Sequence, residues 1–331
     1  MLKDSFGRIH DYLRISLLDK CNFRCLYCLP HSPHNKNGFQ SKNESSLMTT
    51  DEIEMFANAF VKLGVKKIRL TGGEPLIRKD AKEIIHRLSK FPVELTLTTN
   101  GSQIDEFIET FEVAGINSVN VSLDSLDAET FHKLTGRNEF DKVFANIQLL
   151  LDKKSHVKVN VVVMNGINET DIRGFIEWTK STPVHIRFIE FMPFPGNHWQ
   201  PDKLITYKEI LQSIQDHYPE IEKLNDGVHD TAKKFRVKDH AGTFAVISTM
   251  SEPFCGGCNR MRLTADGKMR NCLFSKTETD LLTSLRAGED ITPLIKECLF
   301  GKHYMLGGHL EQQWATSHSE SKERSMLAIG G

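Results

Sequence analysis

The sequence lacks long apolar runs, and its charges almost cancel. No stretch of about 18 apolar residues is present, which argues against a membrane-spanning helix. Residues 1–5 contain no apolar segment of the kind found in secretory signals. The net charge is −1 over 331 residues, which gives no bulk attraction to polyanions. We therefore expect a cytoplasmic protein without a membrane or nucleic-acid partner.

The seven cysteines lack the even, dispersed pattern of a disulfide framework. Cytosolic thiols stay reduced, so grouped cysteines indicate metal ligands. Six of them form two triplets, Cys21, Cys25 and Cys28, then Cys255, Cys258 and Cys272. Cys298 stands alone, and we expect it to be a small, buried, apolar residue.

Neither triplet has an obvious fourth ligand. A cluster of four irons needs one ligand per iron, so three thiolates would leave one iron open to another molecule. The alternative is a structural zinc site, which takes four ligands. For the second triplet, His303 or His309 would be the fourth zinc ligand. The spacing alone leaves both alternatives open.

Strand and helix patterns alternate through the first 225 residues. A capping box at Thr49 and Glu52 marks the start of the first helix. Strands are expected near residues 13–17, 67–70, 93–99, 118–123, 156–163 and 184–191. This alternation implies parallel strands with right-handed crossovers. Six units are too few for a closed eight-stranded barrel, so the sequence predicts a partial one.

The pattern changes near residue 225. Residues 235–238 and 243–247 are typical of a hairpin, the second cysteine triplet follows, and a helical segment is expected near 279–286. We predict a barrel over residues 1–225 and a second region over residues 226–331.

Several polar residues follow the predicted strands. In barrels of this kind, functional residues lie on the loops after the C-terminal ends of the strands. The first triplet, Ser122 and Met192 would lie there, with the turn Thr-Gly-Gly-Glu-Pro at 71–75. The two glycines of the turn permit close approach of a ligand to the backbone. Glu74 is expected to accept a hydrogen bond from an ammonium group.

Basic residues lie within otherwise apolar strands. A charge at such a position is costly unless it is paired or faces a wet cavity. The residues are Arg14, Arg69, Lys158 and Arg187, and together they indicate an anionic ligand inside the barrel. Arg260 and Arg262 alternate beside the second triplet, a pattern suited to a phosphate or carboxylate.

The chain ends in Gly330 and Gly331, after three apolar residues at 326, 327 and 329. Such a tail is either disordered or docked by its apolar residues, with glycines able to enter a narrow pocket.

The motifs CNFRCLYC and TGGEP resemble those of the radical S-adenosylmethionine superfamily. The segment CGGCNRMRLTADGKMRNCLF and the closing IGG are similar to the GTP 3′,8-cyclase family of molybdenum cofactor biosynthesis. The resemblance extends from about residue 8 to 331. It implies a partial (β/α)6 TIM-type barrel whose C-terminal extension carries a second iron-sulfur cluster. Cys21, Cys25 and Cys28 would hold one [4Fe-4S] cluster, and Cys255, Cys258 and Cys272 another.

The resemblance also implies a radical lyase reaction. A 5′-deoxyadenosyl radical would take the C3′ hydrogen of GTP, and C3′ would then bond to guanine C8. The implied S-adenosylmethionine contacts are Tyr27, Gly73, Ser122 and Met192. The implied GTP contacts are Arg14, Arg69, Thr98, Lys158, Arg260, Met261 and Arg262. The implied catalytic residues are Arg14, Gly330 and Gly331.

The implied partners are an electron donor, a downstream cyclic pyranopterin monophosphate synthase and a second copy in a homodimer. Two departures from the family pattern are Leu29, where methionine is common, and a loop at 30–46 with few acidic residues. One alternative is a radical S-adenosylmethionine enzyme with an auxiliary cluster that acts on a peptide. Another is a zinc protein that binds nucleic acid without catalysis.

Overall fold

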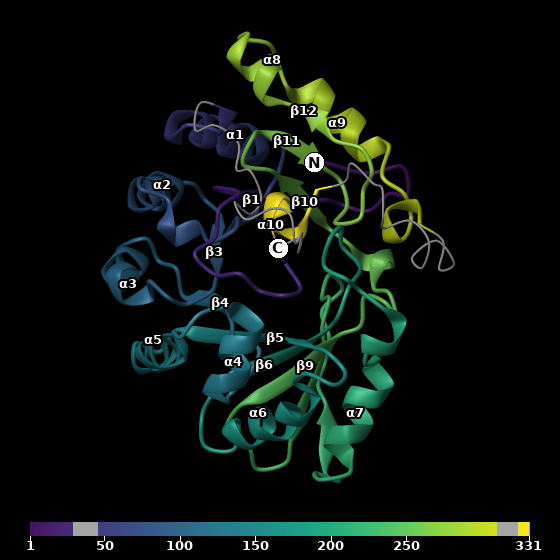
Figure 1. Ribbon diagram of the computed structural model, residues 1–331. Helices are drawn as coiled ribbons and strands as arrows, with labels where there is room; N and C mark the ends of the chain where they lie inside the picture. Colours follow the sequence, from purple (N-terminus) through teal and green to yellow (C-terminus); the bar gives the residue numbers. More distant parts are fainter. Residues whose placement is uncertain (29–45, 310–323, 331) are drawn as a thin grey trace.

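A single curved sheet organises the chain. The structure, a computed structural model, describes residues 1–28, 46–309 and 324–330. In this part of the chain a twelve-stranded sheet has the order β12-β11-β10-β1-β2-β3-β4-β5-β6-β9-β8-β7. Helices lie along its outer face, whereas α10, near the C-terminus, lies on the inner side beside β1 and β10 (Figure 1).

Six parallel strands form the centre of the sheet, as the sequence predicted. They are β1 (Tyr12–Ser16), β2 (Lys67–Thr71), β3 (Glu94–Thr99), β4 (Ser118–Ser122), β5 (His156–Val163) and β6 (His185–Glu190). The connecting helices are α1 (Thr50–Lys62), α2 (Ala81–Leu88), α3 (Ile104–Val113), α4 (Ala128–Thr135), α5 (Phe140–Asp152) and α6 (Ile172–Trp178). The partial (β/α)6 barrel is therefore confirmed.

The first helix shows how local sequence sets an element. The Thr49 hydroxyl accepts from the Glu52 amide at 3.2 Å, and the Glu52 carboxylate accepts from the Thr49 amide at 2.8 Å. This capping box satisfies amides that the helix cannot pair internally. Ile53, Phe56 and Phe60 then repeat at helical spacing and are fully buried against the sheet.

The strands alternate between two environments. On β5, Val157 and Val159 are fully buried toward the helices, whereas Lys158 and Asn160 between them line an internal cavity. The same alternation on β1 buries Leu13 and Ile15 and turns Tyr12 and Arg14 to the cavity. Because neighbouring side chains on a strand point to opposite faces, the outer face forms the core and the inner face a polar site.

The C-terminal region extends this same sheet. Strand β10 (Arg260–Leu263) pairs parallel with β1, and β9 (Thr243–Ile247) pairs parallel with β6. The hairpin of β8 (Lys233–Val237) and β9 confirms the sequence prediction, although its membership of the barrel sheet was not foreseen. Strand β7 (Ile221–Lys223) continues that edge beyond β8. The boundary near residue 225 remains a prediction.

The helix expected near 279–286 is only partly correct. Thr279–Asp280 is strand β12, which pairs with β11 (Lys268–Arg270), and helix α8 covers Leu282–Arg286. The remaining helices are α7 (Tyr207–Gln215), α9 (Thr292–Phe300) and α10 (Met326–Ile329), with 3-10 turns η2 (Pro75–Ile77), η3 (Glu169–Asp171), η4 (Pro201–Lys203), η5 (Cys255–Gly257) and η6 (Leu306–Gly308). None of the helices in the described residues is long and apolar enough to span a membrane.

Candidate active site

The first cysteine triplet lies in the loop that follows β1. The loop is fastened to the end of α4, since the Arg24 and Leu26 amides donate to the carbonyls of Thr135 and Leu134 at 2.8 and 3.0 Å. Burial raises the pKa of each thiol in the triplet, and the other thiols raise the pKa of Cys25 further. The three sulfurs therefore lie close enough to interact electrostatically.

Two buried carboxylates stand beside this loop. Asp124, at the end of β4, accepts from the Tyr27 hydroxyl at 2.8 Å and from the Val162 amide at 2.8 Å. Burial raises the pKa of Asp124 to about 6 and that of Glu74 to about 7. Both oxygens of Glu74 accept from the chain itself, from the Thr99 hydroxyl and the amides at positions 76 and 100. Glu74 therefore braces the turn, and the expected contact with a ligand's ammonium group stays a prediction.

Gly73 is held between the cysteine loop and the C-terminal tail. A β-carbon at this position would lie 2.0 Å from the carbonyl oxygen of Lys20 and 2.9 Å from Cδ1 of Leu327. The Gly73 amide donates to the carbonyl of Leu18 at 2.7 Å. Any side chain at position 73 would therefore push these three segments apart.

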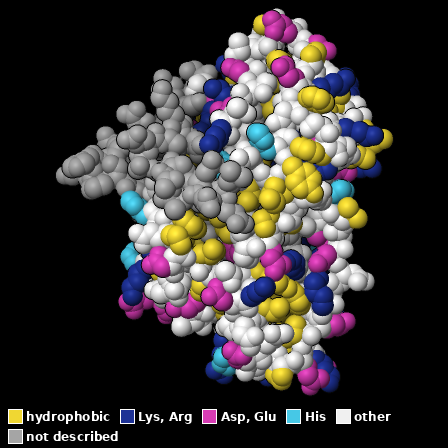
Figure 2. Space-filling view, turned by 90° about the vertical axis from the view of Figure 1, so that its right-hand side faces the viewer, with side chains coloured by type: hydrophobic (Ala, Val, Ile, Leu, Met, Phe, Trp, Pro, Cys, Tyr) yellow, Lys and Arg dark blue, Asp and Glu magenta, His cyan; other side chains and the backbone are white. Residues whose placement is uncertain are grey.

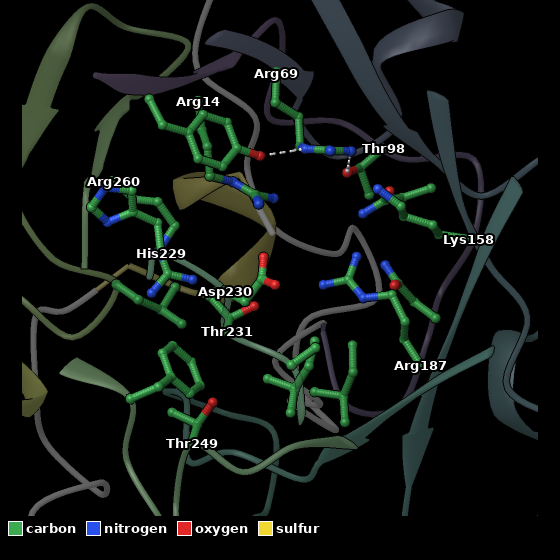
Figure 3. A pocket seen from close by; sticks show the side chains of 18 of the residues that line it. Arg14, Arg69, Thr98, Lys158, Arg187, His229, Asp230, Thr231, Thr249 and Arg260 are labelled. Carbon is green, nitrogen blue, oxygen red and sulfur yellow. Dashed lines mark hydrogen bonds between the residues drawn. The ribbon is translucent and has the colours of Figure 1, made fainter. Parts of the chain in front are cut away.

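A cavity of about 430 Å³ opens on the inner face of the sheet. Its cationic lining comes from four of the six central strands and from β8 and β10, and consists of Arg14, Lys67, Arg69, Lys158, Arg187, Lys234, Arg260 and Arg262. Figure 3 shows Arg14, Arg69, Lys158, Arg187 and Arg260 arranged around one space, with Asp230 among them. On the surface shown in Figure 2, by contrast, Lys and Arg side chains are mixed with Asp, Glu and apolar ones. Eight cationic side chains and one carboxylate, Asp230, thus give the cavity lining an excess of positive charge.

Burial and mutual repulsion lower the pKa values of several of these cationic side chains. Burial lowers the pKa of Arg14 and of Arg187 to about 10, and nearby Arg69 contributes to both shifts. The pKa of Lys158 falls to about 8 through burial and the charges of Arg187 and Arg69. An anion bound in this space would offset both the desolvation of these side chains and their mutual repulsion. The lining thus favours a ligand with several negative charges.

Tyr12 lies within this set of cations and was missed by the sequence analysis. Its hydroxyl oxygen accepts from Nε of Arg69 at 2.5 Å, and Lys67 Nζ lies 5.4 Å from its ring centre. Burial alone would raise the pKa of Tyr12, but the charges of Arg69 and Arg14 outweigh it and lower the pKa to about 7. Arg69 also donates to the carbonyl of Leu97 at 2.8 Å and to the Thr98 hydroxyl at 3.3 Å. The Tyr12 hydroxyl and these two acceptors together hold the Arg69 guanidinium in place.

The second triplet borders the same cavity. Cys255 lies in η5 and Cys258 just after it, and Cys272 follows β11. Burial raises the pKa of Cys255, with smaller contributions from Cys272 and Cys258. The pKa of Cys258 falls to about 6, because Arg260 and Lys302 outweigh the effect of burial. Arg260 Nη2 donates to Cys258 Sγ at 3.6 Å and itself lines the cavity, which joins the triplet to the anion site.

The described residues contain no group of three or more His, Cys, Asp or Glu side chains arranged around a single metal ion. Ligands of a four-iron cluster bind different irons, so they need not converge on one point. His309, the buried candidate for a fourth zinc ligand, instead has Nε2 at 3.2 Å from the carbonyl of Phe274, and His303 is exposed. Cys298 packs against the core as a small residue but is only partly buried, in contrast to the full burial expected, and its Sγ lies 3.9 Å from the carbonyl of Met269.

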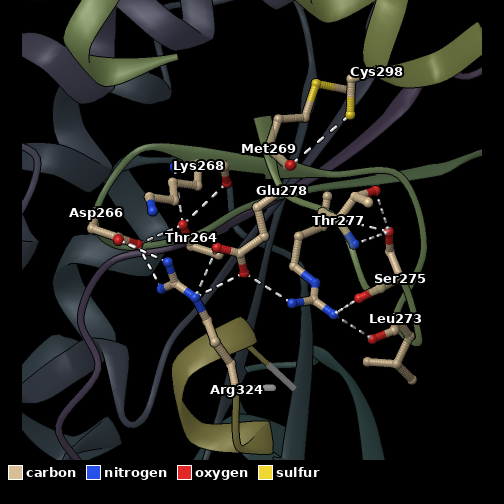
Figure 4. Close-up of polar contacts among 11 residues, drawn as sticks. Thr264, Asp266, Lys268, Met269, Leu273, Ser275, Thr277, Glu278, Cys298 and Arg324 are labelled. Atoms are coloured by element: carbon tan, nitrogen blue, oxygen red, sulfur yellow. Dashed lines mark hydrogen bonds and ion pairs between the residues drawn. The ribbon is translucent and has the colours of Figure 1, made fainter. Parts of the chain in front are cut away.

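The C-terminal tail is docked. Arg324 makes a two-pronged ion pair with Asp266 at 2.7 and 2.8 Å and donates from Nε to Glu278 (Figure 4). Helix α10 follows, with Leu327 and Ile329 buried. Arg262 Nη1 then donates to the carbonyl of Gly330. The predicted docking holds for residues 324–330, whereas Gly331 lies outside the described residues.

The structure brings most of the predicted contact residues together. Arg14, Arg69, Thr98, Lys158, Met192, Arg260 and Arg262 all line the cavity. Tyr27, Gly73 and Ser122 lie instead on the loops or strand ends around the first triplet. The side chain of Met261 is fully buried in the core on the opposite face of β10, which leaves only its backbone for a ligand. Leu29 and residues 30–45 of the loop that departs from the family pattern lie outside the described residues.

Comparison with known proteins places this site in a family. Residues 15–179 match the model of the Radical SAM superfamily, and residues 184–305 match that of Molybdenum Cofactor Synthesis C. The GTP 3′,8-cyclase of Desulforamulus reducens is 36% identical and covers 99% of both chains. The chain belongs to the GTP 3′,8-cyclase family. The mitochondrial GTP 3′,8-cyclase of Arabidopsis thaliana is another relative, 42% identical over 100% of this chain and 84% of its own length.

Some relatives of this GTP 3′,8-cyclase family member are longer. Molybdenum cofactor biosynthesis protein 1 of Mus musculus is 45% identical over 99% of this chain but only 51% of its own length. The chain therefore spans about half of that relative.

Solved structures agree on the fold of the GTP 3′,8-cyclase family member. The crystal structure of Streptococcus suis SuiB has a TM-score of 0.65 at 13% identity, covering 89% of this chain and 67% of SuiB. SuiB bound to its precursor peptide SuiA gives 0.62 at 14% identity, covering 84% and 65%. At such identities the likeness concerns the fold alone. The family match, by contrast, does not favour the peptide-modifying or zinc-binding alternatives.

Proposed function

We propose that this chain is a radical S-adenosylmethionine lyase that converts GTP to (8S)-3′,8-cyclo-7,8-dihydroguanosine 5′-triphosphate, the first step of molybdenum cofactor biosynthesis. The reaction would join ribose C3′ to guanine C8, and the C3′ hydrogen atom would leave as part of 5′-deoxyadenosine. Two electrons would be consumed, one in cleaving S-adenosylmethionine to methionine and the radical, and one, with a proton, in reducing the cyclised nucleotide. The observation that carries the proposal is the buried cationic cavity beside the second cysteine triplet, in a chain that belongs to this family. A nucleoside triphosphate supplies several negative charges and a base in one molecule.

The cysteine triplets fit two [4Fe-4S] clusters. In each triplet the thiols affect one another's pKa, and Cys258 receives charged N–H donors, as a thiolate ligand would. Cys21, Cys25 and Cys28 would hold the first cluster, and Cys255, Cys258 and Cys272 the second. When bound, the first cluster and S-adenosylmethionine supply the 5′-deoxyadenosyl radical that removes the C3′ hydrogen. Tyr27, Gly73, Ser122 and Met192 would hold S-adenosylmethionine beside the first triplet.

The protein's own contribution is to hold GTP still and exclude water. Arg69, Lys158 and Arg187 lie on β2, β5 and β6 around one side of the cavity and are suited to the triphosphate. Arg260 joins the cavity to the second triplet, where the guanine would lie. The docked tail reaches the ends of β1 and β2, since a β-carbon at Gly330 would lie 2.5 Å from Oγ1 of Thr71 and 3.1 Å from Cβ of Ser16. Arg14, Gly330 and Gly331 would act at the reacting atoms. Fixed charges in a buried site act more strongly than in water.

Anaerobic reconstitution tests the proposal. The chain should carry about eight irons and, with S-adenosylmethionine, reductant and GTP, should yield the cyclised nucleotide by mass spectrometry. The matched control replaces Cys255, Cys258 and Cys272 by Ala and should retain about four irons without product. Formation of 5′-deoxyadenosine with unchanged GTP would contradict the assignment and favour a peptide substrate. Two zincs and no iron would favour the non-catalytic alternative.

The proposal also covers the partners of the protein and its cellular location. An electron donor is needed because each turnover consumes two electrons, and the product would pass to a cyclic pyranopterin monophosphate synthase. A homodimer is tested by light scattering. A cytoplasmic location stays a prediction, since the Arabidopsis thaliana relative is named as mitochondrial.

A further inference from the structure

A buried lysine lies directly against the second cysteine triplet. Lys302 follows the end of α9 and is only 4% exposed. Its Nζ donates to Cys258 Sγ at 3.5 Å and to the carbonyl of Arg260 at 3.2 Å, and also to the carbonyl of Asn271. Asn271 precedes Cys272. One ammonium group therefore contacts one ligand sulfur and the backbone next to another.

This charge has no carboxylate partner within the described residues, since none lies within ion-pair distance of Lys302. On the N-terminal segment, Lys302 acts on His10, whose pKa falls to about 4 through burial and the charge of Lys302, so this histidine is neutral at pH 7. The carboxylate of Asp4 is already bound to Arg8 at 2.6 Å and to His10 at 3.0 Å. A buried charge is costly unless it is compensated. The Cys258 sulfur, as a thiolate, is the compensating group that the contacts provide.

The two triplets differ in this respect. The first triplet lies beside two buried carboxylates: the Tyr27 hydroxyl, next to Cys28, donates to Asp124, and Asn100, whose amide donates to Glu74, approaches Cys21 Sγ at 3.7 Å. The second receives cationic donors from Lys302 and Arg260. Hydrogen bonds to cluster sulfurs and nearby charge set the reduction potential of an iron-sulfur cluster. A positive charge stabilises the reduced, more negative form.

We propose that Lys302 is a positioning residue that raises the reduction potential of the cluster held by Cys255, Cys258 and Cys272, through its charge and its N–H donation to Cys258. The inference rests on the proposed function, because it requires the second cluster. Lys302 is not part of the cavity lining, so it acts on the cluster and not on the substrate.

A redox titration of the reconstituted full chain tests this role. Electron paramagnetic resonance gives the midpoint potentials of both clusters in the wild type and in Lys302→Met, Lys302→Gln and Lys302→Arg. The second cluster should become harder to reduce in the order Arg, Gln, Met, with Arg nearest to wild type. The first cluster is an internal reference and should not shift. Lys296→Met, which removes an exposed lysine from α9, is the matched control and should leave both potentials unchanged.

Each other result is decisive. Equal second-cluster potentials in all variants with full iron content would overturn the inference. Loss of the second cluster in both Lys302→Met and Lys302→Gln would make Lys302 a structural support and would also overturn it. Failure of the proposed function would be recognised before any variant is measured, because the wild-type chain would then bind only about four irons.

Discussion

Arg262 donates from Nη1 to the carbonyl oxygen of Gly330, which connects strand β10, between Cys258 and Cys272, to the C-terminal tail. Arg262 is buried and lines the cavity, and its pKa is lowered by burial and by the charges of Arg14 and Arg260. One of its donors is thus used by the tail. Arg262, which the resemblance assigns to GTP binding, therefore also binds the C-terminal tail.

Gly330→Ala should reduce cyclase activity about tenfold or more. Gly330 has φ of 73°, and a β-carbon there would lie 2.5 Å from Oγ1 of Thr71. Left-handed backbone costs about 1–2 kcal/mol for other residues, and the clash adds to it, while each 1.4 kcal/mol is a factor of ten. The measurement is the steady-state rate of cyclised product at saturating GTP, with iron content determined in parallel.

Gly115→Ala is the matched control for this substitution. Gly115 also has positive φ, 67°, but a β-carbon there meets nothing within 4 Å. It should lower thermal stability slightly and leave the rate of each iron-loaded molecule unchanged. Equal rates for Gly330→Ala and wild type would show that the tail's position does not matter for turnover.

Arg324→Ala should release the tail without dismantling the barrel. Arg324 is linked to Asp266 and Glu278, at the turn before β11 and the loop before β12. These contacts are partly buried, and removing one partner leaves uncompensated carboxylates. We expect faster carboxypeptidase digestion of the C-terminus and a loss of activity of about tenfold.

Arg286→Ala is the corresponding control, because Arg286, whose side chain is 43% exposed, pairs with Glu52 of α1 and not with a residue that holds the tail. Exposed pairs contribute about 0–1 kcal/mol, so digestion and activity should remain at wild-type values. If Arg324→Ala and Arg286→Ala were digested at the same rate, the ion pairs of Arg324 would not be what holds the tail.

Lys158→Met and Arg187→Ala should weaken GTP binding by roughly 10–100-fold each, since hydrogen bonds to charged groups contribute about 1.5–3 kcal/mol. Their register on β5 and β6 brings both side chains to the same face of the sheet. Isothermal titration with GTP in the absence of S-adenosylmethionine measures the effect. Lys142→Ala, an exposed lysine on α5, should bind GTP as the wild type does. A wild-type affinity in both cavity variants would move the triphosphate elsewhere.

Sequence alone predicted what local patterns encode. The Thr49 capping box and the strand–helix alternation depend on residues close in the chain, and both are found as expected. The pairing of β10 with β1 and of β9 with β6 was missed, because such long-range contacts leave no local period. Tyr12 was missed because an aromatic residue on a strand normally indicates core, and only the fold places it between Arg69 and Lys67. Arg187 was counted among the basic residues but not assigned to GTP.

Tyr12 gives a pH-dependent prediction for the ligand-free chain. Its pKa is about 7 in the folded protein and about 10 when unfolded. Between these values the unfolded chain binds more protons, so stability should rise with pH from 7 to 10. A shift of three units corresponds to at most about 4 kcal/mol at pH 10, and none of this contribution remains as pH falls below 7.

Urea unfolding of the apo chain at pH 7 and pH 9.5 measures this contribution, and Tyr12→Phe should show a smaller gain over the interval. Lys158 adds to the same rise in stability with pH. Because its pKa is lowered to about 8, it loses its proton, and the repulsion from its cationic neighbours, at a lower pH in the folded chain than in the unfolded chain. Lys158→Met in the Tyr12→Phe background should therefore flatten the profile further. Tyr207→Phe is the control, because burial raises the pKa of that tyrosine and it stays protonated over this range. An identical pH profile for Tyr12→Phe and wild type would mean that Tyr12 stays protonated beside Arg69, acting only as a neutral acceptor.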